Sequence, residues 1–191
     1  MNECGYLHLD IKPSNFLVDE KGGIKLCDFN LSKKIGNFND DINEGDSVYM
    51  SPELLKANKF NQLNEKCDIF SLGLSILEII CKIELPYNGD AWRYIRSGNF
   101  SLTNEYFNNS NLIDIPNDII MLIEDMIRVN SNERKNLNSL LEDYIELKNR
   151  YQNLLNGNYQ RNTNFLGTRT IMNTLSNVRD KRSDSFISCI I

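Results

Sequence analysis

Residues 69–81 are apolar on nearly every side of a helix, and this stretch constrains the fold more than any other part of the sequence. Such a helix is stable only when other parts of the chain cover it all round. The stretch is too short to cross a bilayer, and it contains Glu78. We therefore expect a buried central helix over residues 68–81, in one domain that a chain of 191 residues is long enough to build.

Other helices are indicated by the spacing of apolar residues. The pattern predicts helices over 119–127 and 137–154, and a short helix over 91–97. Asn136 is placed to cap the longest of these, and Gly157 is placed to end it.

A helix start and a hairpin complete the expected elements. Ser51, Pro52 and Glu53 have the composition of a helix start, because serine caps free amides and proline suits the first turn. Two short β-like runs, 15–19 and 23–29, are separated by glycine and predict a hairpin. The expected fold class is mainly α with one short β-hairpin.

Composition narrows the kind of protein. Hydrophobic residues make up 41% and charged residues 25% of the sequence, which is ordinary for a soluble globular domain. The five cysteines are scattered, which favours a reducing, intracellular compartment over a disulfide framework or a zinc site. No secretory signal or membrane span is visible. The net charge of -5 leaves a mildly acidic body, so we expect no nucleic-acid partner. Because no membrane span is visible, we also expect no membrane association.

The end of the chain differs in composition from the rest. Beyond Gly157 the sequence is rich in Asn, Thr, Ser and Arg and has no sustained periodicity. Such segments bury too little apolar surface to fold alone. We expect one domain over residues 1–154 and a polar, largely disordered tail over 155–191.

The segment with the clearest chemistry is residues 8–15, H-L-D-I-K-P-S-N, in which an aspartate precedes an asparagine by five positions. Phosphoryl transfer needs a carboxylate to accept the proton of the acceptor hydroxyl, and amide and carboxylate oxygens to hold magnesium. Asp10 fits the first role, and Asn15 and Asp28 fit the other two. Lys12 places a positive charge where the transferred group gathers negative charge.

This segment resembles the catalytic loop of protein kinases, and further motifs follow in the kinase order. D-F-N at 28–30 stands where kinases have D-F-G, and S-P-E at 51–53 stands where they have A-P-E. D-I-F-S-L-G at 68–73 resembles the D-x-W-S-x-G start of their central helix, and Arg134 follows at the usual later position. The resemblance covers residues 1–154 and implies the kinase C-terminal lobe, with ATP and Mg²⁺ as cofactors.

The same resemblance assigns structural roles to several residues. It implies a buried ion pair between Glu53 and Arg134, and hydrogen bonds from the catalytic-loop backbone to Asp68. His8 is the only histidine and invites an acid–base role, but its kinase counterpart packs beside the phenylalanine of D-F-G, here Phe29. We expect a packing role for His8, because proton acceptance already falls to the loop aspartate.

Three segments narrow the resemblance to the inhibitory Wee/Myt kinases. They are residues 44–55 (E-G-D-S-V-Y-M-S-P-E-L-L), 68–74 (D-I-F-S-L-G-L) and 84–92 (E-L-P-Y-N-G-D-A-W), the last followed by I-R-S-G at 95–98. Members of that family phosphorylate a tyrosine, and in some cases the adjacent threonine, in the glycine-rich loop of a cyclin-dependent kinase, which delays mitosis. The resemblance implies a cyclin-dependent kinase as protein substrate, and a location in the nucleus, the cytoplasm or both.

The residues themselves leave the acceptor open. Lys12 and Pro13 are typical of serine/threonine kinases, so the loop alone predicts an aliphatic hydroxyl. Tyrosine specificity follows only from the resemblance. A serine/threonine kinase of another branch is the alternative.

Two positions depart from the kinase pattern. Leu9 replaces the arginine that usually pairs with a phosphate on the activation segment, here residues 31–50, so we expect activity without phosphorylation of that segment. Asn30 replaces the glycine of D-F-G. Asparagine tolerates a left-handed backbone better than other non-glycine residues, so we expect the turn to form there with some strain.

No glycine-rich phosphate loop, strand lysine or partner glutamate precedes the catalytic loop. We therefore expect a kinase C-lobe without its N-lobe, as a fragment of a longer enzyme. A catalytically inactive scaffold or pseudokinase is the competing interpretation, and both the missing half and Asn30 favour it. The retention of all four predicted catalytic and metal-binding residues speaks against it.

Overall fold

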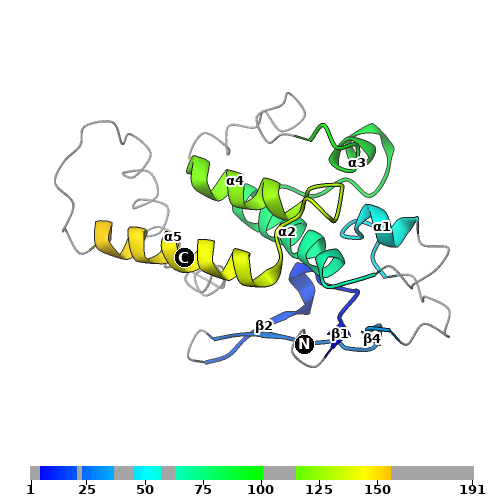
Figure 1. The fold of residues 1–191 in the computed structure, drawn as a ribbon, viewed down its shortest axis with the longest axis horizontal. Coiled ribbons are helices and arrows are strands. Elements are labelled where there is room, and N and C mark those ends of the chain that lie inside the picture. Colours follow the sequence, from blue (N-terminus) through cyan, green and yellow to red (C-terminus); the bar gives the residue numbers. More distant parts are fainter. Residues whose placement is uncertain (1–4, 21–22, 37–44, 57–62, 101–114, 156–191) are drawn as a thin grey trace.

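The computed structural model describes residues 5–20, 23–36, 45–56, 63–100 and 115–155. In these ranges the chain is mainly helical and carries two small antiparallel sheets (Figure 1). The expected fold class, a mainly α kinase-like lobe with a short hairpin, is confirmed. The predicted tail over 155–191 and the predicted helix end at Gly157 lie outside the described residues, apart from Leu155 in the last helix.

Helix α2 (Lys66–Cys81) is the central element, as predicted. The side chains of Phe70, Leu74 and Leu77 are fully buried, which is why the stretch is apolar all round. The helix begins at Lys66 instead of residue 68. The amide of Lys66 donates to Asn64 Oδ1 at 3.0 Å, which satisfies one of the free amides at this helix end.

Helix α4 (Asn117–Met126) packs directly against α2 at Gly73. A Cβ atom at position 73 would lie 2.8 Å from both Met126 Cβ and Ile127 Cγ2. Only glycine therefore permits this close approach of the two helices.

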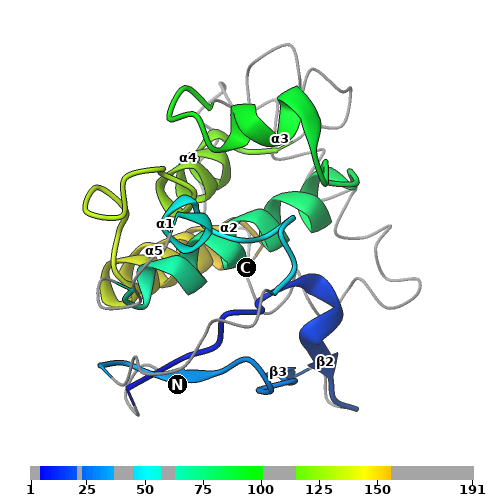
Figure 2. The same cartoon turned by 90° about the vertical axis from the view of Figure 1, so that its right-hand side faces the viewer.

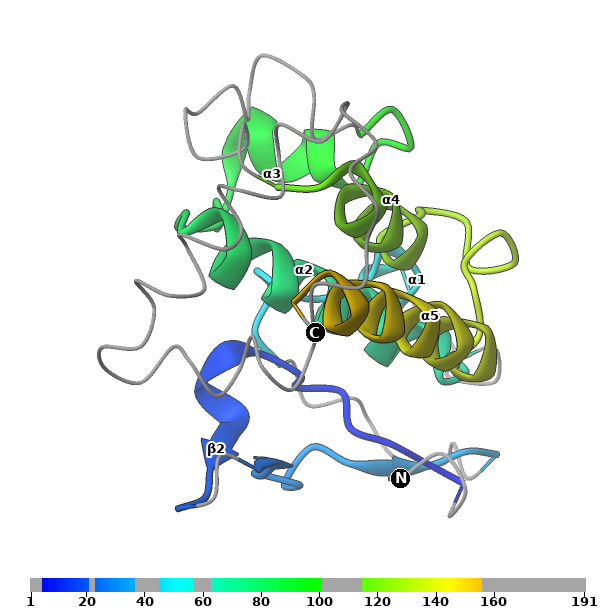
Figure 3. The ribbon, with the colours of Figure 1, turned by 90° about the vertical axis from the view of Figure 1, so that its left-hand side faces the viewer.

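Helix α5 (Leu137–Leu155) lies alongside α4 and closes the core (Figure 3). Its buried residues Leu140, Leu147 and Tyr151 belong to the same apolar cluster as the buried side chains of α2 and α4. The predicted cap is confirmed, since Asn136 Oδ1 accepts a hydrogen bond from the amide of Ser139 at 2.9 Å.

Two short helices complete the helical part. Helix α1 (Pro52–Leu55) starts as predicted, with Ser51 Oγ accepting a hydrogen bond from the amide of Leu54 at 3.3 Å. Helix α3 (Gly89–Ile95) begins two positions before the predicted range, and its first residue, Gly89, has the left-handed φ of +80° that glycine adopts readily. In the described part of the chain, no helix combines the length and apolarity that a membrane span requires.

The predicted hairpin is formed by β2 (Phe16–Val18) and β3 (Ile24–Leu26), which pair antiparallel. Both strands are shorter than predicted, because Asn15 belongs to a 3₁₀ turn, η2 (Pro13–Asn15), and residues 27–29 lie outside the strand that ends at Leu26. The 3₁₀ turn connects the loop of residues 8–12 to the hairpin. Residues 27–29 follow the hairpin and include the predicted site residue Asp28.

A second pair of strands was not predicted. Strands β1 (Tyr6–Leu7) and β4 (Lys33–Lys34) each have only two residues, too few to show an alternating pattern. Both sheets lie on one side of the helices, below them in Figures 1 and 2. A small apolar cluster, which includes Leu7, Leu9 and Cys67, joins this layer to the start of α2.

Candidate active site

The loop of residues 8–12 is fixed to the start of α2 by one carboxylate. Asp68 accepts hydrogen bonds from the amides of His8 at 2.7 Å and of Leu9 at 2.9 Å. Burial raises the pKa of Asp68, and the two backbone donors oppose this increase. Leu9 is buried with φ +67°, a left-handed conformation that costs about 1–2 kcal/mol for a non-glycine residue. Both Asp68 hydrogen bonds and the burial of Leu9 stabilise that strained turn.

His8 is buried, and both of its ring nitrogens are used within the protein. The amide of Asp10 donates to Nδ1 at 3.3 Å, so the neutral ring carries its hydrogen on Nε2, which lies 3.1 Å from the carbonyl oxygen of Cys27. The ring centroid lies 5.1 Å from that of Phe29. His8 therefore connects the loop to the segment after β3, and neither nitrogen is available to a substrate.

Asp28 and Phe29, in the segment after β3, are both exposed. Asp28 is exposed, and Phe29 contacts His8 on one side while 50% of its surface is exposed. The expectation of a left-handed residue at Asn30 is wrong. The left-handed residue is Asp28, with φ +63°. Asn30 lies in a turn that the amide of Ser32 closes on the carbonyl oxygen of Phe29 at 3.0 Å, and its φ is not positive, so the missing glycine imposes no strain at position 30.

The Asp10 carboxylate is oriented by three neighbours. Asn15 Nδ2 donates to Asp10 Oδ2 at 2.9 Å and to the Asp10 carbonyl oxygen at 2.7 Å. Lys12 Nζ lies 3.0 Å from Oδ2, and the amide of Asp46 lies 3.4 Å from Oδ1. Only 9% of the Asp10 side chain is exposed. A carboxylate held in this way can accept a proton from a hydroxyl group in one fixed direction.

Asn15 and Asp28 offer oxygen atoms of the kind that Mg²⁺ prefers. The described hydrogen bonds of the Asn15 side chain use its amide nitrogen, which leaves Oδ1 for a cation. The Asn15 carbonyl oxygen accepts the amide of Cys27 at 2.9 Å, which brings the two segments together beside Asp28. Within the described ranges no cluster of three or more His, Cys, Asp or Glu side chains could enclose a metal ion. The pair therefore fits a cation that takes its other ligands from water and phosphate, as Mg²⁺ commonly does.

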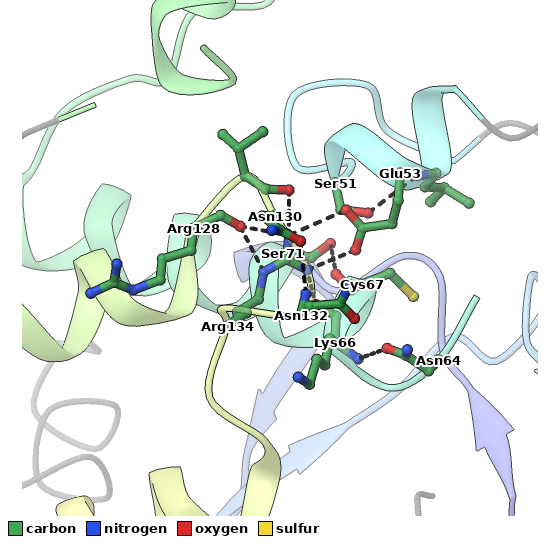
Figure 4. Close-up of polar contacts among 12 residues, drawn as sticks. Ser51, Glu53, Asn64, Lys66, Cys67, Ser71, Arg128, Asn130, Asn132 and Arg134 are labelled. Carbon is green, nitrogen blue, oxygen red and sulfur yellow. Dashed lines mark hydrogen bonds and ion pairs between the residues drawn. The ribbon is translucent and has the colours of Figure 1, made fainter. Parts of the chain in front are cut away.

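Arg134 and Glu53 form an ion pair beside the start of α2 (Figure 4). Arg134 Nη1 and Nη2 donate to Glu53 Oε1 and Oε2 at 2.7 and 3.2 Å. Arg134 is 1% exposed, and its guanidinium group also donates to the carbonyl oxygens of Arg128 and Lys66. These contacts connect α1, the start of α2 and the segment between α4 and α5.

A comparison with models of protein families shows which family the chain belongs to. The model of the protein kinase domain matches residues 1–145, well over half of the chain. The chain belongs to the protein kinase family. Residues 8–15 and 28–30, which resemble the catalytic loop and the D-F-G segment of kinases, both lie within the matched range.

Curated protein kinases that are named as mitosis inhibitors are similar to this chain. The mitosis inhibitor protein kinase SWE1 of Candida albicans is 45% identical over 97 residues, which are 50% of this chain and 8% of that protein. The mitosis inhibitor protein kinase mik1 of Schizosaccharomyces pombe is 40% identical over 96 residues, 50% of this chain and 16% of that protein.

A third relative carries a more specific name. The membrane-associated tyrosine- and threonine-specific cdc2-inhibitory kinase wee-1.3 of Caenorhabditis briggsae is 39% identical over 123 residues, 63% of this chain and 17% of that protein. The resemblance to the inhibitory Wee/Myt kinases is confirmed by these names. The kinase chain spans less than a fifth of the length of each of these three relatives.

The site of this kinase segment includes residues to which the sequence assigned no role. A Cβ atom at Gly45 would lie 2.8 Å from the carbonyl oxygen of Leu9, so this glycine packs directly on the catalytic loop. Asp46 Oδ2 lies 3.8 Å from Lys12 Nζ. In the sequence, the E-G-D string at 44–46 indicated only a resemblance to the Wee/Myt kinases. It did not indicate that these residues contact Asp10.

Proposed function

We propose that this chain is the C-terminal lobe of a magnesium- and ATP-dependent protein kinase of the Wee/Myt type, which transfers phosphate to a hydroxyl group of a cyclin-dependent kinase. One observation carries the proposal. The Asp10 carboxylate is only 9% exposed and is held by Asn15, Lys12 and Asp46, and the Mg²⁺-compatible oxygen atoms of Asn15 and Asp28 belong to adjoining segments. This combination meets the needs of phosphoryl transfer.

Each residue of the site has a distinct task in this proposal. Asp10 orients the acceptor hydroxyl and takes up its proton, and Lys12 stabilises negative charge on the transferred group. Asn15 and Asp28 hold magnesium. When bound, Mg²⁺ neutralises charge on the phosphates of ATP and orients them. Lys12 Nζ lies 3.0 Å from Asp10 Oδ2, and this ion pair helps to hold the carboxylate in one orientation.

The remaining predicted residues support the site from outside it. Asp68 fixes the loop backbone, and His8 and Phe29 pack the loop against the D-F-N segment. Glu53 and Arg134 fix the end of the activation segment. We propose residues 1–154 as the folded unit and residues 155–191 as a separate polar tail.

The substrate follows from the names of the relatives. One of them is described as a tyrosine- and threonine-specific cdc2-inhibitory kinase, and two as mitosis inhibitor kinases. We infer that this chain takes part in the same inhibition, in the nucleus or cytoplasm. Phosphoamino-acid analysis of the product distinguishes a tyrosine acceptor from the serine or threonine that Lys12 favours.

The test compares Asp10→Asn with wild type in the full-length kinase that carries this lobe. With Mg²⁺-ATP and a cyclin-dependent kinase as substrate, we expect the rate to fall by about 10²–10⁴-fold, since general-base help is lost. Asp90→Asn is the matched control, because it makes the same change on a carboxylate whose side chain is 82% exposed. Equal rates for Asp10→Asn and wild type contradict the assignment of the base. A wild-type protein that binds the substrate but transfers no phosphate supports the scaffold instead.

A further inference from the structure

Arg96, directly after α3, binds the backbone of a distant segment. Its Nε donates to the carbonyl oxygen of Met50 at 3.1 Å, and Nη2 donates to those of Ser47 at 3.1 Å and Val48 at 2.7 Å. Nη1 donates to the carbonyl oxygen of Trp92 at 3.3 Å. One side chain therefore holds three carbonyl groups of the last part of the activation segment.

The positive charge of the Arg96 guanidinium group is compensated by groups other than carboxylates. In the described part of the chain, no carboxylate forms an ion pair with Arg96. Its guanidinium carbon lies 4.1 Å from the ring centroid of Trp92 and 5.7 Å from that of Phe70, both within the range of cation–π attraction. Burial lowers the pKa of Arg96 to about 10, so the group stays charged at neutral pH. Carbonyl dipoles and aromatic faces supply the compensation.

The segment that Arg96 holds has no regular structure, yet each carbonyl group from 47 to 50 accepts a side-chain hydrogen bond. Trp92 Nε1 also donates to Ser47 at 3.1 Å, and Ser71 Oγ donates to Tyr49 at 2.9 Å. Among the described residues, the donors of these bonds are Ser71 of α2 and the side chains of Trp92 and Arg96. Loops normally lack such a set of fixed contacts and are mobile.

The segment leads directly to the catalytic base. The amide of Asp46 lies 3.4 Å from Asp10 Oδ1, and Asp46 Oδ1 accepts the amide of Val48 at 3.1 Å. A shift of residues 47–50 therefore moves the groups that orient Asp10. Arg96 touches neither Asp10 nor Lys12 among its described contacts, so it can act on them only through this segment.

We propose that Arg96 is a positioning residue, which holds residues 46–50 against Asp10 in the unmodified chain. It takes the place of the phosphate–arginine pair that position 9 cannot form, because Leu9 is there. The hydrogen-bonding role is independent of the proposed function, whereas its effect on catalysis rests on that function. Lysine cannot replace it, because an ammonium group cannot reach three carbonyl groups that a planar guanidinium fork spans.

The first test measures hydrogen exchange at the amides of residues 45–50 in the full-length protein. In Arg96→Met we expect exchange to be at least about tenfold faster, since contacts that protect the segment are lost. Arg93→Met is the matched control: it removes the same charge one turn away, from a side chain that is 73% exposed and pairs with Asp90. Protection equal to wild type in Arg96→Met overturns the proposal.

Two milder variants keep the test decisive if Arg96→Met fails to fold. Arg96→Lys keeps the charge and the aliphatic chain, and we expect it still to lose protection of residues 45–50. Trp92→Phe keeps a smaller aromatic face for Arg96 and removes the N–H donor to Ser47, so we expect a smaller loss. Full protection in Arg96→Lys means that charge alone holds the segment, which contradicts the proposal.

The second test is kinetic and uses the same variants. We expect kcat/KM for the protein substrate to fall by about 10–100-fold in Arg96→Met and to change little in Arg93→Met, since small displacements of catalytic groups have large effects. The KM for ATP should stay within about twofold, because Arg96 contacts neither Asn15 nor Asp28 among its described contacts. Faster exchange with unchanged kcat/KM overturns the positioning role. If wild type is itself inactive, the proposed function fails while the exchange result still decides the role of Arg96.

Discussion

Arg134 Nη1 donates to Glu53 Oε1 at 2.7 Å, although 81 positions separate the two residues in the chain. The Arg134 side chain is fully buried, and the Glu53 side chain is 23% exposed. Glu53 lies in α1, which follows directly after the segment that Arg96 holds. The pair therefore fixes the far end of that segment to the last part of the core.

Removal of one partner leaves a buried charge without compensation. We expect Arg134→Met to lower the free energy of unfolding by about 3–5 kcal/mol, measured by urea denaturation. Arg93→Met is the control, because it breaks an exposed pair with Asp90 that contributes about 0–1 kcal/mol. A loss below about 1 kcal/mol in Arg134→Met contradicts a stabilising role for the buried pair.

A double variant separates the cost of the orphaned charge from that of the lost pair. Glu53→Met removes the carboxylate, and in combination with Arg134→Met it leaves neither charge behind. We expect the double variant to be less destabilised than the sum of the two single variants, since replacement of both charges avoids an unpaired one. The same urea titrations give this coupling energy, and strict additivity contradicts the interpretation.

Gly45 is the point where the activation segment touches the catalytic loop. In Gly45→Ala a Cβ atom would lie 2.8 Å from the Leu9 carbonyl oxygen and 3.5 Å from Asp10 Oδ1, so the segment has to shift. We expect kcat to fall by about tenfold or more because the base is displaced. Ser47→Ala is the control, since Ser47 contributes its backbone carbonyl to the site and its side chain is exposed. An active Gly45→Ala enzyme contradicts this view of the contact.

Phosphorylation of the activation segment should not be required. Its hydroxyl-bearing residues are Ser32, Ser47 and Tyr49, and position 9, where a kinase usually has arginine, is a buried leucine next to Leu31. We expect the triple variant Ser32→Ala, Ser47→Ala, Tyr49→Phe to keep most of its activity per folded molecule. Tyr49→Phe removes a hydrogen bond to Glu78 and should lower the unfolding free energy by about 1 kcal/mol.

The measurement compares the triple variant with phosphatase-treated wild type. Both should phosphorylate the substrate at similar rates. If the variant is folded but inactive, a phosphate on this segment is needed, and the interpretation of Leu9 is wrong.

The helical framework could be predicted from the sequence because it depends on local signals. Burial of α2 on all sides, the Ser51 cap and the Asn136 cap each follow from residues adjacent in sequence. The same holds for the hairpin, apart from its exact ends. The pair of two-residue strands could not be predicted, because two residues are too few to show periodicity.

The candidate site depends more on contacts between distant residues. The sequence suggested which residues perform the chemistry, but not that Gly45 and Asp46 touch the catalytic loop. It also placed left-handed backbone at Asn30, whereas the structure has it at Leu9 and Asp28. Leu9 adopts this conformation because Asp68 accepts its amide from 59 positions away, and no local pattern encodes such a contact.

Cys67 and Cys81 offer a test of the core that is independent of activity. Burial raises the pKa of the Cys81 thiol to about 12, and burial together with nearby Asp68 and Glu53 raises that of Cys67 above its ordinary value of 9.0. Because both folded-state values exceed the unfolded value, the two thiols contribute stability that is present below pH 9 and is lost as the pH rises through the folded values.

At pH 8.5, iodoacetamide should therefore leave Cys67 and Cys81 unmodified in the folded protein, because the reactive thiolate is scarcely populated and both sulfur atoms are buried. Mass spectrometry of the two peptides after short pulses in increasing urea should show labelling that follows global unfolding. Cys27 is the internal comparison, because its side chain is only partly buried and its labelling need not await unfolding. Rapid labelling of Cys81 without urea shows that α2 opens locally, and then the central helix is not closed on every side as its apolar sequence requires.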